Sequence, residues 1–211
     1  MHNTTRREML GLLGLAPVVP FAAQLLAPNS AAAAAGGLSP RDKIRQRYLP
    51  NVELQTQDGK TVHFYDDLVK DKIVTLNFFY AKCEGICPTV TANLARVQKI
   101  LGEHVGQDVF MNSISLKPEH DTPAVLKEYA QMFKAKPGWT FLTGKPDDIE
   151  LLRRSLGFTN LDPELDKDKS QHIGNVRYGN EPLMLWAACP GMGSPEFLAK
   201  SISWVIRKDK G

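Results

Sequence analysis

The feature that most constrains the fold is an apolar run that passes directly into a helical pattern. Residues 73–80 form a short run rich in β-branched and aromatic side chains, which is typical of a buried strand. From Pro88 to Leu101 the apolar residues recur at helical spacing. Pro88 suits a first helical turn because its missing N–H would have no partner there. We therefore predict a strand-to-helix corner at residues 81–88.

Two cysteines, Cys83 and Cys87, fall at this corner. The free N–H groups and the dipole of a first helical turn stabilise a thiolate, so we expect a lowered pKa at both sulfurs. The three residues between the cysteines leave two uses open: the pair can close a disulfide if the turn bulges, or it can surround one soft metal ion. Two cysteines that only pack are a weaker interpretation, because a pair beside a proline at such a corner is a specific arrangement.

The rest of the chain has the pattern of an α/β domain with a central mixed sheet flanked by helices. A second buried strand at 108–116 follows the cysteine helix, and a strand, helix and strand in this order predict a parallel pair. Asp58-Gly59 lies between two alternating segments and predicts an N-terminal β-hairpin. We expect further strands at 139–143, 173–178 and 183–188, further helices beginning near Pro123, Pro146 and Ser194, and a charged loop at 160–169.

The N-terminal residues have the pattern of an export signal. Paired arginines, Arg6 and Arg7, precede an apolar segment at 12–27, and small residues at 31–35 offer cleavage sites. We predict that residues 1–35 form a cleaved twin-arginine signal, that 36–50 form a linker, and that 51–211 form the domain. The alternative is an uncleaved membrane anchor, which internal Pro and Gly residues weaken. The expected location is periplasmic or otherwise extracytoplasmic.

Charge and cysteine content limit the partners further. The formal net charge is +3 and no block of basic residues appears, so we expect no nucleic-acid partner, and contact with a membrane only if the N-terminal segment is retained. Outside the cytosol, a thiol pair becomes a disulfide unless a reductant or a metal holds it. The chain has 3 cysteines, so at least one thiol is free, metal-bound or intermolecular.

Residues 78–89, which contain both corner cysteines, and residues 113–130 together resemble the Sco/SenC family of copper-binding, thioredoxin-like proteins. The resemblance covers roughly Val52 to Phe158. It implies a thioredoxin-like fold and a copper ion bound by Cys83, Cys87 and one distant histidine. It also implies delivery of copper to the dinuclear copper centre of cytochrome c oxidase, and a second use of the same cysteines as a thiol-disulfide couple.

His172 is the expected third ligand, because it lies just before the late hairpin, where the family has its ligand histidine. Copper(I) is soft and accepts two thiolates and an imidazole. The other histidines have weaker claims: His2 leaves with the signal, and His63, His104 and His120 are interpreted as surface or turn residues.

The chain departs from the family pattern at several positions. Lys117 stands where members commonly have Asp, and Gln171 and Ile173 flank the histidine where members commonly have Asp and Thr. A third cysteine, Cys189, lies close to Met192. We interpret Cys189 as a buried packing thiol with Met192 filling a gap; the alternative is an auxiliary pair of soft copper donors. Met111 and Met132 are both expected in the core.

These observations favour a copper carrier, which is not an enzyme, over a thiol-disulfide oxidoreductase. The carrier's partners would be a cuproprotein acceptor, such as a cytochrome c oxidase subunit, and a thiol reductant protein. In the oxidoreductase, Cys83 would attack a disulfide and Cys87 would resolve the mixed disulfide. That activity predicts a cis-proline opposite the cysteines, yet no proline lies between Pro163 and Pro182.

Overall fold

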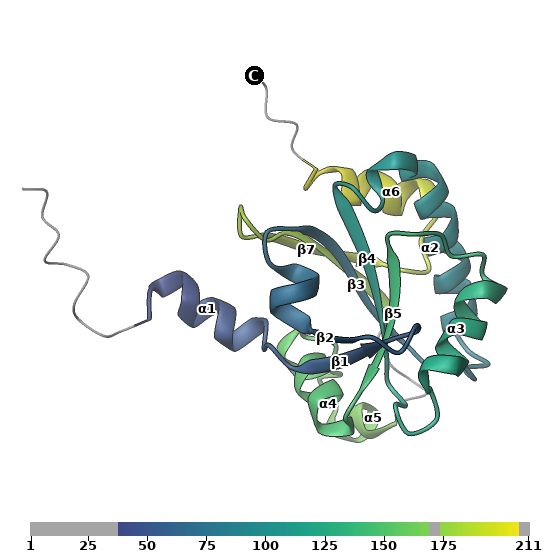
Figure 1. Cartoon of the computed structure of the whole chain (residues 1–211), viewed down its shortest axis with the longest axis horizontal. Coiled ribbons are helices and arrows are strands. Elements are labelled where there is room, and N and C mark those ends of the chain that lie inside the picture. Colours follow the sequence, from purple (N-terminus) through teal and green to yellow (C-terminus); the bar gives the residue numbers. More distant parts are fainter. Residues whose placement is uncertain (1–37, 169–173, 207–211) are drawn as a thin grey trace, which may run out of the picture. The chain divides into compact units, whose positions relative to one another are not determined.

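The computed structural model describes residues 38–168 and 174–206 (Figure 1). The predicted export signal and His172 lie outside these described residues. In chain order the principal elements are α1 (Pro40–Tyr48), β1 (Glu53–Thr56), β2 (Thr61–His63), the π-helix η2 (Phe64–Val69), β3 (Ile73–Phe79), α2 (Cys87–Leu101), the 3₁₀ turn η3 (Gly102–His104), β4 (Val109–Ser115), α3 (Pro123–Met132), β5 (Trp139–Gly144), α4 (Pro146–Ser155), α5 (Pro163–Lys167), β6 (Asn175–Asn180), β7 (Leu185–Pro190) and α6 (Pro195–Ser203).

Seven strands form one mixed sheet in the order β2-β1-β5-β4-β3-β6-β7. β3 pairs in parallel with β4, and β4 pairs in parallel with β5, as the strand-helix-strand pattern predicted. β6 pairs antiparallel with the other edge of β3 and continues into β7. β3 is therefore an inner strand whose end positions the cysteine corner between β4 and β6.

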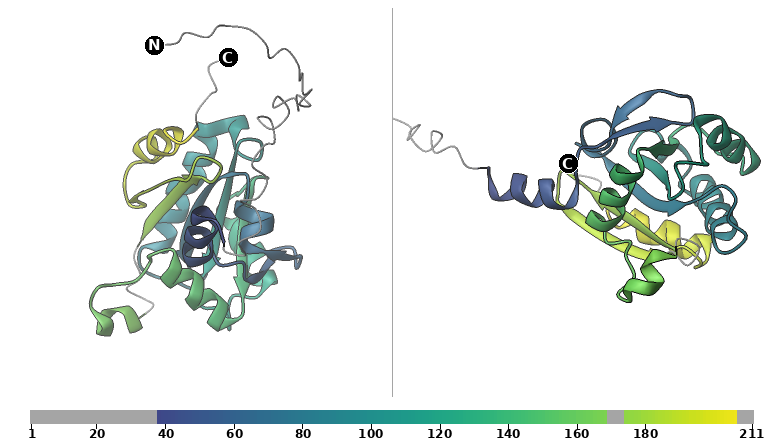
Figure 2. Two further views of the ribbon diagram at one scale, coloured as in Figure 1. Left: turned by 90° about the vertical axis from the view of Figure 1, so that its left-hand side faces the viewer. Right: turned by 90° about the horizontal axis from the view of Figure 1, so that it is seen from below.

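Helices cover both faces of the sheet (Figures 1 and 2). On one face, α2, α3 and α6 enclose a core that contains Phe79, Leu94 and both corner cysteines. On the other face, η2 and α4 enclose a second core with Leu76 and Phe78 of β3. Successive residues of a strand point to opposite faces, and both faces of β3 are buried, so five of its seven residues are apolar and the polar Thr75 and Asn77 are buried as well.

The N-terminal hairpin forms as predicted. β1 and β2 pair antiparallel, and Gly59 between them has φ 77°, a conformation that glycine adopts without steric cost.

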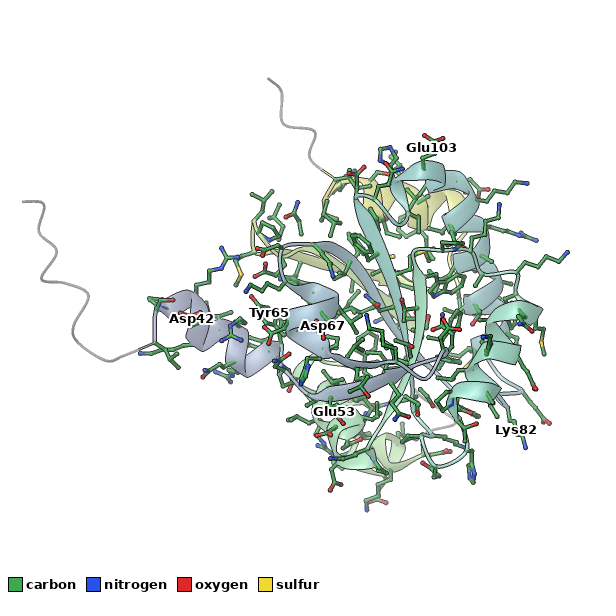
Figure 3. All side chains as sticks on the ribbon, viewed as in Figure 1. Asp42, Glu53, Tyr65, Asp67, Lys82 and Glu103 are labelled. Atoms are coloured by element: carbon green, nitrogen blue, oxygen red, sulfur yellow. The ribbon has the colours of Figure 1, made fainter. Side chains whose placement is uncertain are left out.

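Helix α1 lies within residues 36–50. Arg45 of α1 is 4.6 Å from the centre of the ring of Tyr65, a residue of η2 on the side of α1 (Figure 3). No helix in the described part of the chain is long and apolar enough to cross a membrane.

Three local predictions are wrong. The predicted charged loop contains the short helix α5, because Arg153 of α4 binds Asp166 of α5 through two hydrogen bonds of 2.6 Å. The late hairpin turns at residues 181–184, two residues later than expected, since the backbone N–H of Glu181 donates to the Lys72 carbonyl beside β3. Met132 is 71% exposed at the end of α3, whereas Met111 is buried as predicted.

Candidate metal centre

The two corner cysteines lie where β3 ends and α2 begins. The chain turns immediately after β3, where the backbone N–H of Cys83 donates to the Tyr80 carbonyl at 3.2 Å. Cys87 is the first residue of α2 and is followed by Pro88, as the sequence predicted. Cys83 is 6% exposed and Cys87 is 1% exposed, whereas Lys82 on the same loop points outward into solvent (Figure 3). Cys83 is thus the more accessible sulfur.

The two thiols are reduced and hydrogen-bonded to each other. Burial alone would raise the pKa of Cys83, but hydrogen bonds from the Cys87 thiol, the Cys87 and Gly85 backbone N–H groups and the Tyr80 hydroxyl together lower it. The pKa of Cys87 is raised, first by burial and then by its bond to Cys83. The prediction of a lowered pKa at both sulfurs is therefore wrong for Cys87, because burial outweighs the helix terminus there. The arrangement favours one thiolate, on Cys83.

Asp121 ties the cysteine corner to the neighbouring strand. Its carboxylate is 2% exposed, and Oδ2 accepts from the Ala81 backbone N–H at 3.1 Å and from the Ser115 hydroxyl at 2.5 Å. The Leu116 N–H also donates to the Phe79 carbonyl at 2.7 Å. The sequence analysis did not single out Asp121, and Thr122 rather than Asp121 caps α3. The signal that was missed is the position of Asp121 in the loop between α3 and β4, the buried strand parallel to the cysteine strand.

Lys117 lies beside the same corner. Its ammonium is 4.2 Å from the centre of the Tyr80 ring, and the Tyr80 hydroxyl is hydrogen-bonded to Cys83. Burial, followed by the bond to Cys83, raises the pKa of Tyr80 to about 12. Lys117 thus places a cation on the ring whose hydroxyl is hydrogen-bonded to Cys83.

The structure does not describe His172, but it describes the residues on both sides of that segment. On one side, the charge of Asp168 acts on Tyr80. On the other, Gly174 packs so closely on the corner that a Cβ there would be 2.5 Å from Cδ1 of Ile86, between the two cysteines. Of the two residues that flank 169–173, Gly174 therefore packs on the cysteine corner, and Asp168 is near enough for its charge to act on Tyr80.

The remaining histidines do not join the cysteines. His63 lies 3.6 Å from Asp67 and His104 lies 2.6 Å from Asp108, and both histidines are exposed, as is His120. The prediction that they are surface residues is confirmed. Within residues 38–168 and 174–206, no group of three or more His, Cys, Asp or Glu side chains is arranged to hold a metal ion.

Cys189 is buried in β7, within the same core as the cysteine pair. Burial raises the pKa of its thiol to about 11, so it is protonated at neutral pH. The packing interpretation of Cys189 agrees with this environment. Met192 is 52% exposed and fills no gap, so that part of the prediction is wrong.

The family model SCO1/SenC matches residues 41–206. The chain belongs to the SCO1/SenC family. It is 35% identical over 113 residues to the "SCO1 protein homolog" of Bacillus subtilis, an alignment of 53% of this chain and 56% of that protein. It is 34% identical over 98 residues to a "SCO2-like protein" of Rickettsia felis, which covers 46% of this chain and 45% of the relative. The chain thus spans about half the length of these SCO1/SenC relatives.

Solved SCO1/SenC structures share the fold. A family lipoprotein from Bacillus anthracis aligns over 74% of this chain and 93% of its own, with a TM-score of 0.62 and 26% identity. ScoI of Arabidopsis thaliana with copper bound aligns over 74% of this chain and 95% of its own, with a TM-score of 0.58 and 26% identity. ScoI of Bradyrhizobium japonicum, also with copper bound, aligns over 72% of this chain and 96% of its own, with a TM-score of 0.59 and 26% identity. The predicted thioredoxin-like α/β fold is confirmed, and the Arabidopsis thaliana and Bradyrhizobium japonicum structures hold copper.

The residues present fit a copper ion. The corner holds two reduced sulfurs in hydrogen-bond contact, and thiolates are soft ligands that suit copper(I). One of the sulfurs already favours the ionised form that binds metal. The chemistry of these two sulfurs therefore suits copper(I).

Proposed function

We propose that this protein is an exported copper carrier that binds one copper ion through Cys83, Cys87 and His172. The observation that carries the proposal is the preformed pair of reduced thiols, buried at a corner and hydrogen-bonded to each other. Two thiolates and one imidazole form a three-coordinate set suited to copper(I). A copper(II) ion would take one further weak donor in addition to these three ligands.

The assignment of His172 as third ligand is supported by the chain on both sides of it. Gly174 packs against Ile86 of the corner, and the charge of Asp168 acts on Tyr80, so both described residues that flank 169–173 lie near the corner. Gly174 is also held in place, because its carbonyl accepts from the Gly191 N–H at 2.8 Å. His172 precedes this anchor by two residues in the sequence, which supports its assignment as the third ligand.

The carrier would give its copper to a cuproprotein, such as the subunit that holds the dinuclear copper centre of cytochrome c oxidase. One structural relative, BsSco, 27% identical with a TM-score of 0.58, is described as a member of the Sco family of cytochrome c oxidase assembly proteins. Transfer would proceed by ligand exchange, beginning at the more accessible Cys83. The predicted twin-arginine signal would bring the protein to the periplasm.

Redox state would control loading. Copper needs both thiolates, so a disulfide between Cys83 and Cys87 would remove two of the three ligands, and a thiol reductant protein would restore them. A dedicated oxidoreductase is the weaker alternative. The cis-proline expected for that activity does not appear, since no peptide bond among the described residues is cis.

The test is an anaerobic titration of the fully reduced protein with copper(I), read by competition with a chelator of known affinity. We expect one tightly bound equivalent in the unaltered chain and a large loss of affinity in Cys83→Ser, Cys87→Ser and His172→Ala. His63→Ala is the matched control and should bind normally, because His63 is exposed and paired with Asp67. Equal binding by all five proteins would contradict the proposal.

A further inference from the structure

A small cavity lies on the sheet face opposite the cysteines. Its volume is about 200 Å³, and its walls come from α1, α4 and the β6–β7 hairpin. Val176 and Tyr178 of β6 belong to the core that contains the cysteine pair, so Arg177 between them points to the other face, where it lines this cavity. The cavity is thus separated from the metal centre by the sheet itself.

Most of the cavity wall is apolar. Ile44 and Leu49 contribute from the α1 region, Leu156 from the end of α4, and Met184 and Trp186 from the hairpin. The Trp186 indole lies flat over Gly179, where any side chain would collide with the ring. This wall suits the aliphatic or aromatic part of a ligand rather than an inorganic ion.

Arg177 is the unusual member of the wall. Among residues 38–168 and 174–206, no group forms a hydrogen bond or an ion pair with its guanidinium, whose nearest notable neighbour is the Phe158 ring at 6.0 Å. Gly157 makes room for it, since a Cβ there would lie 2.7 Å from Nη2. Burial lowers the pKa of Arg177. A partly buried cation without a counter-ion is costly, so proteins generally pair such groups.

A second arginine on the wall is already paired. Arg45 lies 3.7 Å from Asp42 and 4.6 Å from the centre of the Tyr65 ring. The indole N–H of Trp186, like Arg177, has no acceptor among the described residues. Arg177 therefore gives the cavity a cation for which the described residues supply no acceptor, and a ligand carboxylate would complement it.

We propose that this cavity binds a small amphiphilic anion, a carboxylate joined to a short aliphatic chain or a single aromatic ring. The carboxylate would pair with Arg177, and the apolar part would lie against Trp186, Leu156 and Met184. The cavity is smaller than the roughly 300–1,000 Å³ of sites for drug-sized ligands, so the ligand is correspondingly small. Because the sheet separates the two sites, occupancy here leaves the cysteine corner free for copper.

The test uses octanoate as the anion and 1-octanol as its uncharged analogue, each titrated calorimetrically into the full-length chain. We expect octanoate to bind at one site per chain at least about tenfold more tightly than octanol, because only octanoate can pair with Arg177. Arg177→Met should remove that preference. Arg154→Met is the matched control, because Arg154 is an exposed arginine of α4 that pairs with Glu150 outside the cavity.

Thermal unfolding accompanies the titration. Arg177→Met should melt no lower than the unaltered chain, since it removes an uncompensated charge and keeps the apolar stem. The proposal is overturned if octanoate fails to bind, if octanol binds equally well, or if Arg177→Met retains the preference for octanoate. If that variant does not fold, the comparison of octanoate with octanol on the unaltered chain decides alone.

Discussion

Two sulfurs four positions apart along the chain hold their protons with different strength. Cys83 receives hydrogen bonds from four groups, which lower its pKa, whereas Cys87 lies deeper and has a raised pKa. The difference arises from burial and from hydrogen bonds that only the folded chain provides. Cys83 is thus the sulfur better prepared to meet a metal ion or an electrophile, and Cys87 would have to lose its proton in order to bind a metal.

Replacing Tyr80 by Phe tests this asymmetry. The change removes the hydroxyl that is hydrogen-bonded to Cys83, so the pKa of Cys83 should rise and its alkylation by iodoacetamide at pH 7 should slow several-fold. The measurement is the alkylation rate against pH, with the Cys83 adduct identified by mass spectrometry. Tyr178→Phe, which alters a tyrosine near Cys189, should leave the Cys83 profile unchanged. An unchanged profile in Tyr80→Phe would show that the hydroxyl has no such role.

Replacing Asp121 by Ala tests the anchor of the corner. The change leaves the Ala81 N–H and the Ser115 hydroxyl buried without their acceptor, which should cost about 2–3 kcal/mol of unfolding free energy. Urea denaturation measures this loss. Asp58→Ala removes an exposed carboxylate that pairs only with Lys127, so it should cost less than about 1 kcal/mol. Similar losses in the two variants would contradict the anchoring role.

At the scale of elements, buried charged groups hold segments that have little stability of their own. Glu181, in the β6–β7 turn, accepts from Arg41 of α1 at 2.9 Å, from the Tyr65 hydroxyl of η2 at 3.0 Å and from the Asp71 N–H at 3.0 Å. On the other side of the domain, Arg153 joins α5 to α4. Glu181 connects elements that are distant in the sequence, whereas Arg153 connects two consecutive helices, and each arrangement can be tested through stability.

Glu181 predicts a specific pH dependence. Burial alone would raise its pKa, but the hydrogen bonds from Asp71, Arg41 and Tyr65 outweigh burial and lower the pKa below 4.5. A lowered pKa in the folded state means that the carboxylate stabilises the fold fully above about pH 4.5 and that this contribution is lost as the pH falls further. Glu181→Gln should therefore be less stable at pH 7 and show a smaller loss between pH 5 and pH 3 in urea denaturation. Parallel stability curves for the two proteins would contradict this account.

Arg153 predicts a large difference between two adjacent arginines of α4. Its guanidinium is buried and binds Asp166, Glu150 and the Phe158 carbonyl, and the two carboxylates raise its pKa. Arg153→Met removes the two hydrogen bonds that join the buried guanidinium to Asp166 and should cost about 3 kcal/mol of unfolding free energy. Arg154→Met removes an exposed cation and should cost less than about 1 kcal/mol. Urea denaturation compares the two, and equal losses would exclude the proposed role of Arg153.

The elements also show which parts of the fold are readable from sequence. The β3–α2 corner and the β1–β2 hairpin were predicted because local periodicity, Pro88 and Asp58-Gly59 determine them. Helix α5 was missed because it depends on a guanidinium from another helix rather than on its own propensity. The anchoring role of Asp121 was missed because Ala81, its partner, lies 40 positions away in the sequence.

For the whole molecule, the sheet divides the domain into two faces with different chemistry. One face carries the cysteine pair under α2 and α6, and the other carries the cavity beside Arg177. The cysteine ligands were predicted from a short motif, and the family match supports the copper assignment. The Arg177 cavity was not predicted, because it depends on α1, α4 and the late hairpin meeting in space, which no local pattern indicates.

The most direct test of the account is X-ray absorption spectroscopy of the fully reduced protein loaded with one equivalent of copper(I). We expect two sulfur ligands and one imidazole nitrogen at the metal, and we expect the imidazole signal to disappear in His172→Ala while the two sulfurs remain. The same spectrum in His120→Ala should match that of the unaltered chain, because His120 is exposed and lies outside the proposed site. A copper site without sulfur ligands, or one whose imidazole persists in His172→Ala, would contradict the account.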